Sequence, residues 1–547
     1  MPIRSFARVS VCLLAFMASA ADGADSTWTG GTDALWSTTT NWNPGTPGSG
    51  DTAVFDGPGS GQTTIDLGGG ATVAALRFST ASAAAYTIGS AGQSLSLSAA
   101  GEAVAVAADV TSAQAIAADL TLAAAGTFTT RNEGGGLLSF TGPITGNSAG
   151  TAVLEVTGGG DTTLAGAVST SGGNVSLFKQ GTGTLTLSGG GTFAGSGVVD
   201  PASFAASAVF QEGTTVVSGG SYDNSGTNLI VGSYATAGAA GTNALLQLDA
   251  GGAIGNVNGF NIGRGNGTGT ASSDVVLNGN AAISAVTGTF GFNGGSTSNQ
   301  PRTSLVMNDS STLTFSGKFA TVGRSPGSNS TMTVNDSALV DMTYAITSSE
   351  DGSGFAVGGY GSTGSLLVDG GTLRATWVDV ARGDNNTQTS LGTVTVTNGG
   401  LLSSQGNIRL GFAGNSSTQA AVTIDGGTMS LGTTAERWMI LGRYDATNST
   451  VTVQNGGRLD LNANSDIRFT QNSNTGTNVF TLADGSVTGY SDVGQTATGN
   501  SVVDLNYGST AAGTNNTFNL DGGTLTIRRV VTGNNAGRAR FNFNGGL

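Results

Sequence analysis

The stretch Leu366-Leu-Val-Asp369-Gly-Gly-Thr-Leu373 decides the fold, because the chain repeats it. Close copies begin at Val394, Val422, Val451 and Phe518, and looser copies surround Asp249, Asn278, Asn308, Asn335 and Asp484. Measured from one Asn or Asp to the next between positions 249 and 521, the steps are 29, 30, 27, 34, 29, 27, 30, 29 and 37 residues. A repeat of this length indicates a chain built from stacked units.

Each unit starts with alternating apolar and polar residues, the pattern of a strand that buries one face. Asn or Asp followed by Gly-Gly then tolerates positive φ, so the chain turns sharply. A second apolar strand follows and ends in a glycine corner, as in Ile408-Arg-Leu-Gly411 and Met439-Ile-Leu-Gly-Arg443. Each unit therefore contains two or three short strands.

Two architectures fit short strands that are separated by such turns. Asn-Gly between alternating strands is a strong hairpin signal, which would give antiparallel sheets or propeller blades. However, propeller blades contain four strands in about 40–45 residues. We therefore predict an all-β fold, a right-handed parallel β-helix with coils of about 29 residues that stack roughly 4.8 Å apart.

Equivalent residues of successive coils would then stack on one another. Repeated Val, Leu and Ile would fill the interior, and the Asn or Asp of each corner could form a hydrogen-bonded ladder. Asp in place of Val396 or Leu441 should break the inner stack, because an unpaired charge would be buried. Arg382, at a corner where other coils carry Gly-Arg, is expected to tolerate replacement.

Residues 1–24 have the features of a signal peptide. Arg4 and Arg8 precede a short apolar segment, and Ala18-Ser-Ala20 provides a cleavage site of small residues. The pattern predicts a secreted or cell-surface protein associated with the outer membrane. Cys12 is the only cysteine, so removal of this segment would leave a chain without thiols.

Composition excludes several classes of function. The net charge of −14 and the pI near 4.3 argue against nucleic-acid binding, which needs clustered Lys and Arg. No later apolar run is long enough to cross a membrane. The chain has no histidine, which removes Ser-His-Asp triads and histidine metal sites. We predict no cofactor, no metal and no catalytic residue.

Residues 25–63 form a Trp-rich first block, with Trp28, Trp36 and Trp42 close together. One interpretation is an N-terminal cap, because the terminal units of a repeat protein are atypical. The other interpretation is a platform on which sugar rings stack. Both interpretations follow from the same three residues.

Residues 64–200 are rich in Ala, Gly and Thr, and their larger apolar residues alternate, so strands are predicted even for the alanine-rich segment 101–126. Here Phe178-Lys-Gln-Gly-Thr-Gly-Thr-Leu-Thr-Leu-Ser-Gly189 resembles the autotransporter-associated β-strand repeat, with its Lys-x-Gly-x-Gly-Thr-Leu-x-Leu-x-Gly pattern. The opening block, Trp-x-Gly followed by Asn-Trp and Asp-x-Ala-x-Phe, resembles the start of many such exported proteins.

The resemblance implies a surface or secreted passenger-like protein and supplies no catalytic residues. It covers about residues 25–200, whereas the coils of residues 201–547 resemble the family only in style. Such proteins commonly end in a membrane barrel or a sorting tail. This chain ends at Phe541-Asn-Phe-Asn-Gly-Gly-Leu547, the opening of another coil, so we expect that a barrel or sorting module is missing from the C-terminus.

Paired carboxylates could still catalyse glycoside hydrolysis. The charged residues that do not belong to the repeat are Asp379, Asp384 and Glu436 with Arg382 and Arg437. The remaining Asp residues recur mainly at the turn position, which is Asn in other coils. A catalytic acid could not be replaced by an amide in this way. Two glycine-rich stretches, 158–161 and 350–354, resemble calcium loops but lack the tandem period of such loops.

The sequence therefore predicts a non-catalytic β-solenoid passenger with a structural, adhesive or surface-coat role. Polysaccharide of the envelope or environment is the partner it could contact. The alternative is a polysaccharide-active β-helix enzyme, a hydrolase or lyase, that uses paired carboxylates. A third option is an inert stalk that presents a further module.

Overall fold

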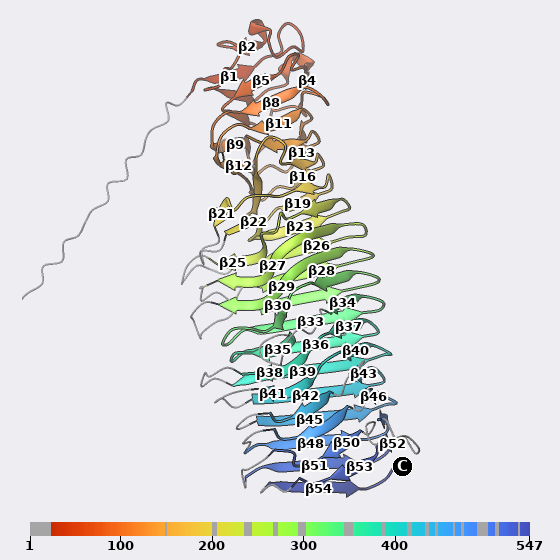
Figure 1. Cartoon of the computed structure of the whole chain (residues 1–547). Helices are drawn as coiled ribbons and strands as arrows, with labels where there is room; N and C mark the ends of the chain where they lie inside the picture. The colour runs from red at the N-terminus through yellow and green to blue at the C-terminus, as the bar shows by residue number, and fades with distance from the viewer. Residues whose placement is uncertain are drawn as a thin grey trace, which may run out of the picture.

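The computed structural model describes residues 23–147, 150–199, 205–234, 243–265, 272–293, 302–343, 354–383, 389–412, 418–432, 437–443, 447–462, 465–471, 475–489, 501–508, 513–533 and 537–547. It is a parallel β-solenoid of about 15 coils, each of roughly 28 residues, which confirms the predicted fold class. Figure 1 shows the coils in one column, from the N-terminal strands at one end to β54 at the other. Among the described residues, no helix is long and apolar enough to span a membrane.

Each coil has three strands, which define three faces of the solenoid. Face 1 is a stack of parallel strands that end, from β26 onward, at the Asn/Asp corner. Its members are β4 (Thr64–Ile65), β7 (Thr87–Ile88), β10 (Gln114–Ile116), β13 (Leu138–Phe140), β16 (Thr162–Leu164), β19 (Thr184–Leu187), β23 (Gly213–Val217), β26 (Ala244–Leu248), β28 (Ser272–Leu277), β30 (Arg302–Met307), β33 (Asn329–Asn335), β36 (Thr363–Asp369), β39 (Ser390–Thr397), β42 (Thr418–Asp425), β45 (Thr447–Gln454), β48 (Thr477–Leu482), β51 (Asn515–Leu520) and β54 (Arg538–Phe543).

Face 2 is the parallel stack that follows the Asn/Asp corner. Its members are β5 (Ala71–Val73), β8 (Ser94–Leu97), β11 (Asp119–Leu122), β14 (Ile144–Gly146), β17 (Val168–Ser169), β20 (Gly191–Thr192), β24 (Ser221–Asp223), the first parts of β27 (Ala253–Gly265) and β29 (Ala282–Asn293), β31 (Thr312–Phe315), β34 (Leu339–Met342), β37 (Thr372–Ala375), β40 (Leu401–Ser404), β43 (Thr428–Leu431), β46 (Arg458–Leu461), β49 (Ser486–Thr488) and β52 (Thr524–Thr526).

Face 3 closes each coil, and the long strands β27 and β29 run from face 2 into it. Its other members are β1 (Asp25–Trp28), β3 (Thr52–Phe55), β6 (Ala75–Phe78), β9 (Gly101–Val106), β12 (Gly126–Asn132), β15 (Ala152–Thr157), β18 (Val175–Lys179), β22 (Ala205–Phe210), β25 (Asn228–Tyr234), β32 (Phe319–Val322), β35 (Gly354–Gly359), β38 (Val378–Arg382), β41 (Ile408–Phe412), β44 (Trp438–Leu441), β47 (Asp466–Phe469), β50 (Val502–Asp504) and β53 (Arg529–Val531).

Four small elements lie outside the three stacks. The strands β2 (Trp42–Asn43) and β21 (Val198–Val199) pair antiparallel with β1 and β22, respectively. The 3-10 helices η1 (Thr39–Asn41) and η2 (Gly59–Gly61) lie in the first coils. The stacks run in parallel register across residue 200, where the sequence suggested a division.

The corner between faces 1 and 2 shows why the repeat needs two glycines. Gly370 has a φ of +76°, a conformation that side chains rarely adopt. A Cβ atom on Gly371 would lie 2.6 Å from the carbonyl oxygen of Val334 in the previous coil. The first glycine therefore permits the turn, and the second permits the coils to approach each other.

One hydrophobic core runs through the solenoid from Trp28 to Leu520. Val396 and Leu441 are completely buried within it, as the alternating pattern predicts. The alanine-rich segment 101–126 forms strands β9, β10 and β11, which confirms the strand prediction. Alternation of the larger side chains outweighs the helix propensity of alanine because the fold is stabilised by the stacked interior.

Candidate functional site

Trp28, Trp36 and Trp42 lie in the first coils and pack on one another. Their side chains are between 1% and 4% exposed. The ring centroids of Trp28 and Trp42 are 5.0 Å apart and those of Trp36 and Trp42 are 4.6 Å apart, both edge to face. Phe55 and Tyr86 continue the cluster toward the next coils. The indole groups thus fill the N-terminal end of the core, and stacking of sugar rings on them stays an untested prediction.

Polar groups hold this cluster in place. Asn41 is fully buried, its side-chain Oδ1 accepts the backbone N–H of Thr32 at 2.9 Å, and its side-chain Nδ2 donates to Asp33 at 2.7 Å. The Trp42 indole N–H donates to the Trp36 carbonyl at 2.7 Å. Burial, aided by the charge of Asp56, raises the pKa of Tyr86 to about 12. The Asn-Trp pair of the opening motif thus has a structural explanation.

Lys179, the first residue of the Lys-x-Gly motif, is the last residue of β18 and is buried. Its ammonium group donates to the carbonyl oxygens of Gln180 at 2.7 Å, Gly181 at 2.6 Å and Glu212 at 3.1 Å. Burial lowers its pKa to about 8, against the opposing effect of the Glu212 and Asp161 carboxylates. The lysine joins two successive coils, because Glu212 belongs to the coil that follows.

One file of outward-directed residues on face 3 is accessible to solvent in the first coils and buried in later ones. By strand register the file is Glu102, Thr129, Glu155, Phe178, Val209, Ile230, Asn261, Thr289, Thr321, Ala356, Asp379, Arg409, Ile440, Arg468 and Asp504. Its first three members are exposed or half-buried, whereas every member from Val209 to Arg468 is buried. We call it the outer file.

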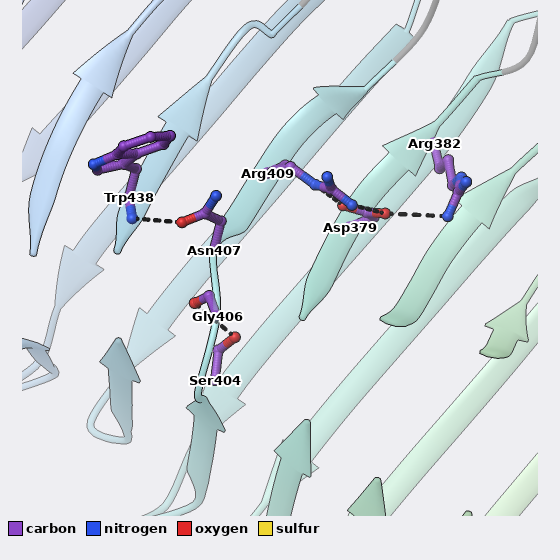
Figure 2. A network of polar contacts seen from close by, with 7 residues as sticks. All are labelled: Asp379, Arg382, Ser404, Gly406, Asn407, Arg409 and Trp438. Atoms are coloured by element: carbon purple, nitrogen blue, oxygen red, sulfur yellow. Dashed lines mark hydrogen bonds and ion pairs between the residues drawn. The ribbon is translucent and has the colours of Figure 1, made fainter. Parts of the chain in front are cut away.

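Asp379 and Arg409, both fully buried, form an ion pair in this file. Figure 2 shows the contact between the two side chains. Arg409 Nε donates to Asp379 Oδ1 at 2.5 Å, and Arg409 Nη2 donates to Asp379 Oδ2 at 2.8 Å. Arg382 Nη1 approaches Asp379 Oδ2 at 3.4 Å. Both oxygens of Asp379 therefore accept from guanidinium groups, so the carboxylate serves a structural ion pair in this arrangement.

Arginine and aromatic side chains alternate around the outer file. The Arg409 guanidinium lies 4.4 Å from the Phe412 ring and 5.5 Å from the Trp377 ring. Arg468 lies 4.0 Å from the Trp438 ring and 4.2 Å from the Tyr507 ring, and it pairs with Asp466 at 2.8 Å. Cation–π contacts of this kind stabilise the guanidinium groups of buried arginines.

The charged group suggested by the sequence is only partly assembled. Asp379 and Arg382 are in contact, Arg437 lies 5.9 Å from the Trp377 ring, and Asp384 and Glu436 fall outside the described residues. Sequence analysis did not identify Arg409, although it lies 30 residues after Asp379 in the sequence, a separation of one coil. Aligning the units by strand register would have revealed the pair.

Arg382 lies at the predicted corner position but is buried there, so the structure does not support the expectation that it tolerates replacement. Ala381 has a φ of +56°, which turns the chain so that Arg382 continues β38 beside Phe412. The side chain is 8% exposed and does not point into solvent from a corner. Replacement would therefore disturb a buried ion pair.

The Asn/Asp residues of the corner form the expected ladder. Asn278 donates to Asp249 at 3.2 Å, Asn308 to Asn278 at 2.9 Å and Asn335 to Asn308 at 2.8 Å. Further pairs join Asn398 to Asp369, Asn455 to Asp425 and Asn544 to Asp521, at 2.6, 2.5 and 2.6 Å. In each pair the amide donates to the preceding coil, so every Asp ends a run because its carboxylate cannot donate.

A hollow of about 580 Å³ opens at this corner, lined by Asn335, Asp336, Asp369, Gly370 and Asn398. Sequence analysis did not find it, since each of these residues resembles its counterparts in other coils. Within the described residues, no three His, Cys, Asp or Glu side chains are grouped to hold a metal ion. Residues 350–353, part of one calcium-like stretch, lie outside the described residues.

Three comparisons with known proteins complete the description of the site. No protein-family model, no curated protein and no solved structure matches this chain.

Proposed function

We propose that this chain is a non-catalytic β-solenoid of the cell surface, exported through its N-terminal segment, with a structural, adhesive or coat role. The observation that carries the proposal is the uninterrupted stack of about 15 coils around one core. At about 4.8 Å per coil, the stack is a rod of roughly 70 Å. A rod offers long parallel surfaces for repeated contacts rather than one enclosed pocket.

The surface chemistry supports this role. The Asn/Asp ladder and the outward Thr and Ser of face 1 repeat from coil to coil. Asp379 and Arg409 are the least exposed charged residues that the structure describes, and they form an ion pair with each other. The resemblance of residues 25–200 to autotransporter-associated repeats favours the same class, and polysaccharide is the partner that such a surface fits.

The proposal can be tested by expressing the full chain in a Gram-negative host. We expect cleavage after the Ala18-Ser-Ala20 site, protease accessibility on intact cells, and rods in electron micrographs of the purified protein. Incubation with plant and bacterial polysaccharides should release no reducing ends or unsaturated products. An uncleaved cytoplasmic protein would refute the surface role, and released sugar would establish the enzymatic alternative.

A further inference from the structure

The corner ladder is interrupted between Asn335 and Asp369, although the two residues are register partners. Asn335 donates to Asn308 in the preceding coil, and Asp369 Oδ1 accepts from Asn398 in the following coil. Among the described residues, no side-chain hydrogen bond joins Asn335 to Asp369. Asn335 Oδ1 and Asp369 Oδ2 therefore accept no side-chain hydrogen bond from the described chain, and both residues are half-buried beside the hollow.

A second interruption, between Asn398 and Asp425, differs in one respect. There Asn455 donates to Asp425 Oδ1 at 2.5 Å and Gln454 donates to Asp425 Oδ2 at 3.3 Å. Both carboxylate oxygens of Asp425 thus have donors within the protein. Asp369 has one such donor, and its interruption coincides with the polar hollow of about 580 Å³.

The hollow adjoins an uncharged surface on face 1, which we call the threonine face. Its outward side chains lie in two files that are in register over five coils. They are Thr331, Thr333, Ser365, Leu367, Thr393, Thr395, Ala421, Thr423, Thr450 and Thr452, all exposed or half-buried. Spacing is about 4.8 Å along each file and about 6.7 Å between the files, so the surface is regular and carries hydroxyl and methyl groups only.

We propose that the hollow and the threonine face bind a neutral, extended glycan. Sugar hydroxyls would donate to Asn335 Oδ1, Asp369 Oδ2 and the Asp336 carboxylate in place of water. The C–H faces of the sugar rings would lie on the methyl groups of Thr333, Leu367 and Thr395. This inference rests on the proposed surface function and names the ligand class and the residues that bind it.

The negative charge at the hollow favours a neutral glycan over an acidic glycan or a second copy of the chain. The hollow contains Asp336 and Asp369 but no Lys or Arg, and the chain has a net charge of −14. An acidic glycan would meet like charge at the hollow. A second copy of the chain would bring two rows of corner carboxylates together. A neutral glycan avoids both repulsions.

The deciding variant is Asp369→Asn in the full chain. An Asn at this position can donate to Asn335 and still accept from Asn398, so it closes the ladder and removes the unpaired acceptors. Stability should be kept or slightly raised, while glycan binding should weaken by about tenfold or more, since hydrogen bonds to an ionised acceptor are lost. Asp425→Asn is the matched control, because it removes the same charge from the same corner where both oxygens already have donors.

Binding would be measured by affinity electrophoresis in gels that contain xyloglucan, galactomannan, mixed-linkage β-glucan or dextran, with alginate as the acidic comparison. We expect the wild type and Asp425→Asn to be retarded by at least one neutral glycan and not by alginate, and Asp369→Asn to migrate freely. No retardation of the wild type by any neutral glycan would overturn the proposal, as would equal retardation of Asp369→Asn.

Two further results would assign the hollow to another occupant and overturn the glycan proposal. Loss of wild-type retardation in EDTA would indicate a cation site. A dimer in sedimentation velocity that Asp369→Asn abolishes would indicate a self-association surface. A protein that is displayed on cells but binds no glycan would refute this inference and leave the proposed function intact.

Discussion

The coils before residue 200 and those after it share one interior but differ in how they treat charge outside it. In the early coils the outer file carries Glu102, Thr129 and Glu155, and these side chains reach solvent. Thr129 donates to Glu155 at 2.6 Å, and Arg131 pairs with Glu102 at the surface. In the later coils the same file is buried and contains Asp379 and Arg409.

The difference shows that the inward and the outward residues of a solenoid meet different requirements. The inward residues alternate identically in both regions, because every coil must present the same apolar surface to its neighbours. The outward residues are under no such constraint, so one file can be a solvated surface in one region and a buried ion pair in another. Stability should therefore respond alike to changes inside both regions and differently to changes outside them.

The largest effect is expected when the shared interior is charged. Val396→Asp in β39 and Leu185→Asp in β19 each place a carboxylate in a completely buried position. Burial of an unpaired charge costs several kcal/mol, so both variants should lose their local coils, as seen by limited proteolysis and circular dichroism. Thr395→Asp, outward on the same strand as Val396, is the control and should remain folded. A region that tolerated the charge would not share the common core.

The second effect should separate the two regions. Asp379→Ala leaves the Arg409 guanidinium buried without its carboxylate, and such a change typically destabilises a protein by about 3–5 kcal/mol. Glu155→Ala changes the same file where it reaches solvent and should shift stability by about 0.5 kcal/mol or less. Urea unfolding of the two variants and the wild type measures both values.

A double variant sharpens this result. Asp379→Leu combined with Arg409→Met removes both charges and should recover most of the loss, because an apolar pair of similar volume often replaces a buried ion pair without cost. Equal losses for Asp379→Ala and Glu155→Ala would mean that the outer file is solvated along its whole length.

Sequence analysis predicted the parts of this molecule that depend on repetition. The inward positions of Val396 and Leu441, and the ladder that joins Asn308 to its neighbours, follow from aligning one unit with the next. Each requires only that equivalent residues stack. The tryptophan cluster was open to two interpretations, because clustering alone does not say whether the rings face the core or solvent.

What escaped prediction depends on burial outside the central core and on single hydrogen bonds. Arg382 lies at the predicted Gly-Arg position, and the residue before it has a positive φ as in other coils, but the alternating pattern did not show that this position is buried. The hollow lies where Asp369 accepts from Asn398 alone, whereas Asp425 accepts from both Asn455 and Gln454. Neither feature changes the hydrophobic pattern, so neither is visible in one unit read alone.

The third effect concerns pH and belongs to the early coils. Lys179 has a folded-state pKa of about 8, below its usual 10.5. Between these values the unfolded chain binds more protons than the folded chain, so the contribution of Lys179 to stability increases as pH rises through this range. Lys179→Met leaves three carbonyl oxygens without their donor and should destabilise the corner by about 1–3 kcal/mol at neutral pH.

The measurement is the urea midpoint of unfolding for the wild type and for Lys179→Met, each at pH 7.5 and pH 9.5. The difference between the two proteins is then compared at the two pH values. The difference should be larger at pH 9.5, and this range stays below the titration of Tyr86, whose pKa is about 12. A difference that does not change with pH would show that the amine keeps its proton in the folded protein, as it does in the unfolded chain.

The smallest effect tests the corner ladder, which the later coils possess. Asn308→Ala removes a donor to Asn278 at 2.9 Å and an acceptor for Asn335 at 2.8 Å, both half-buried. A loss of about 1 kcal/mol is expected, since each such bond contributes about 0.5–1.5 kcal/mol and water replaces part of it. Thr145→Ala, which removes contacts of 3.3 Å in the early coils, should cost less. If the two variants lose equal stability, the ladder is a consequence of stacking and contributes no more than ordinary polar contacts between coils.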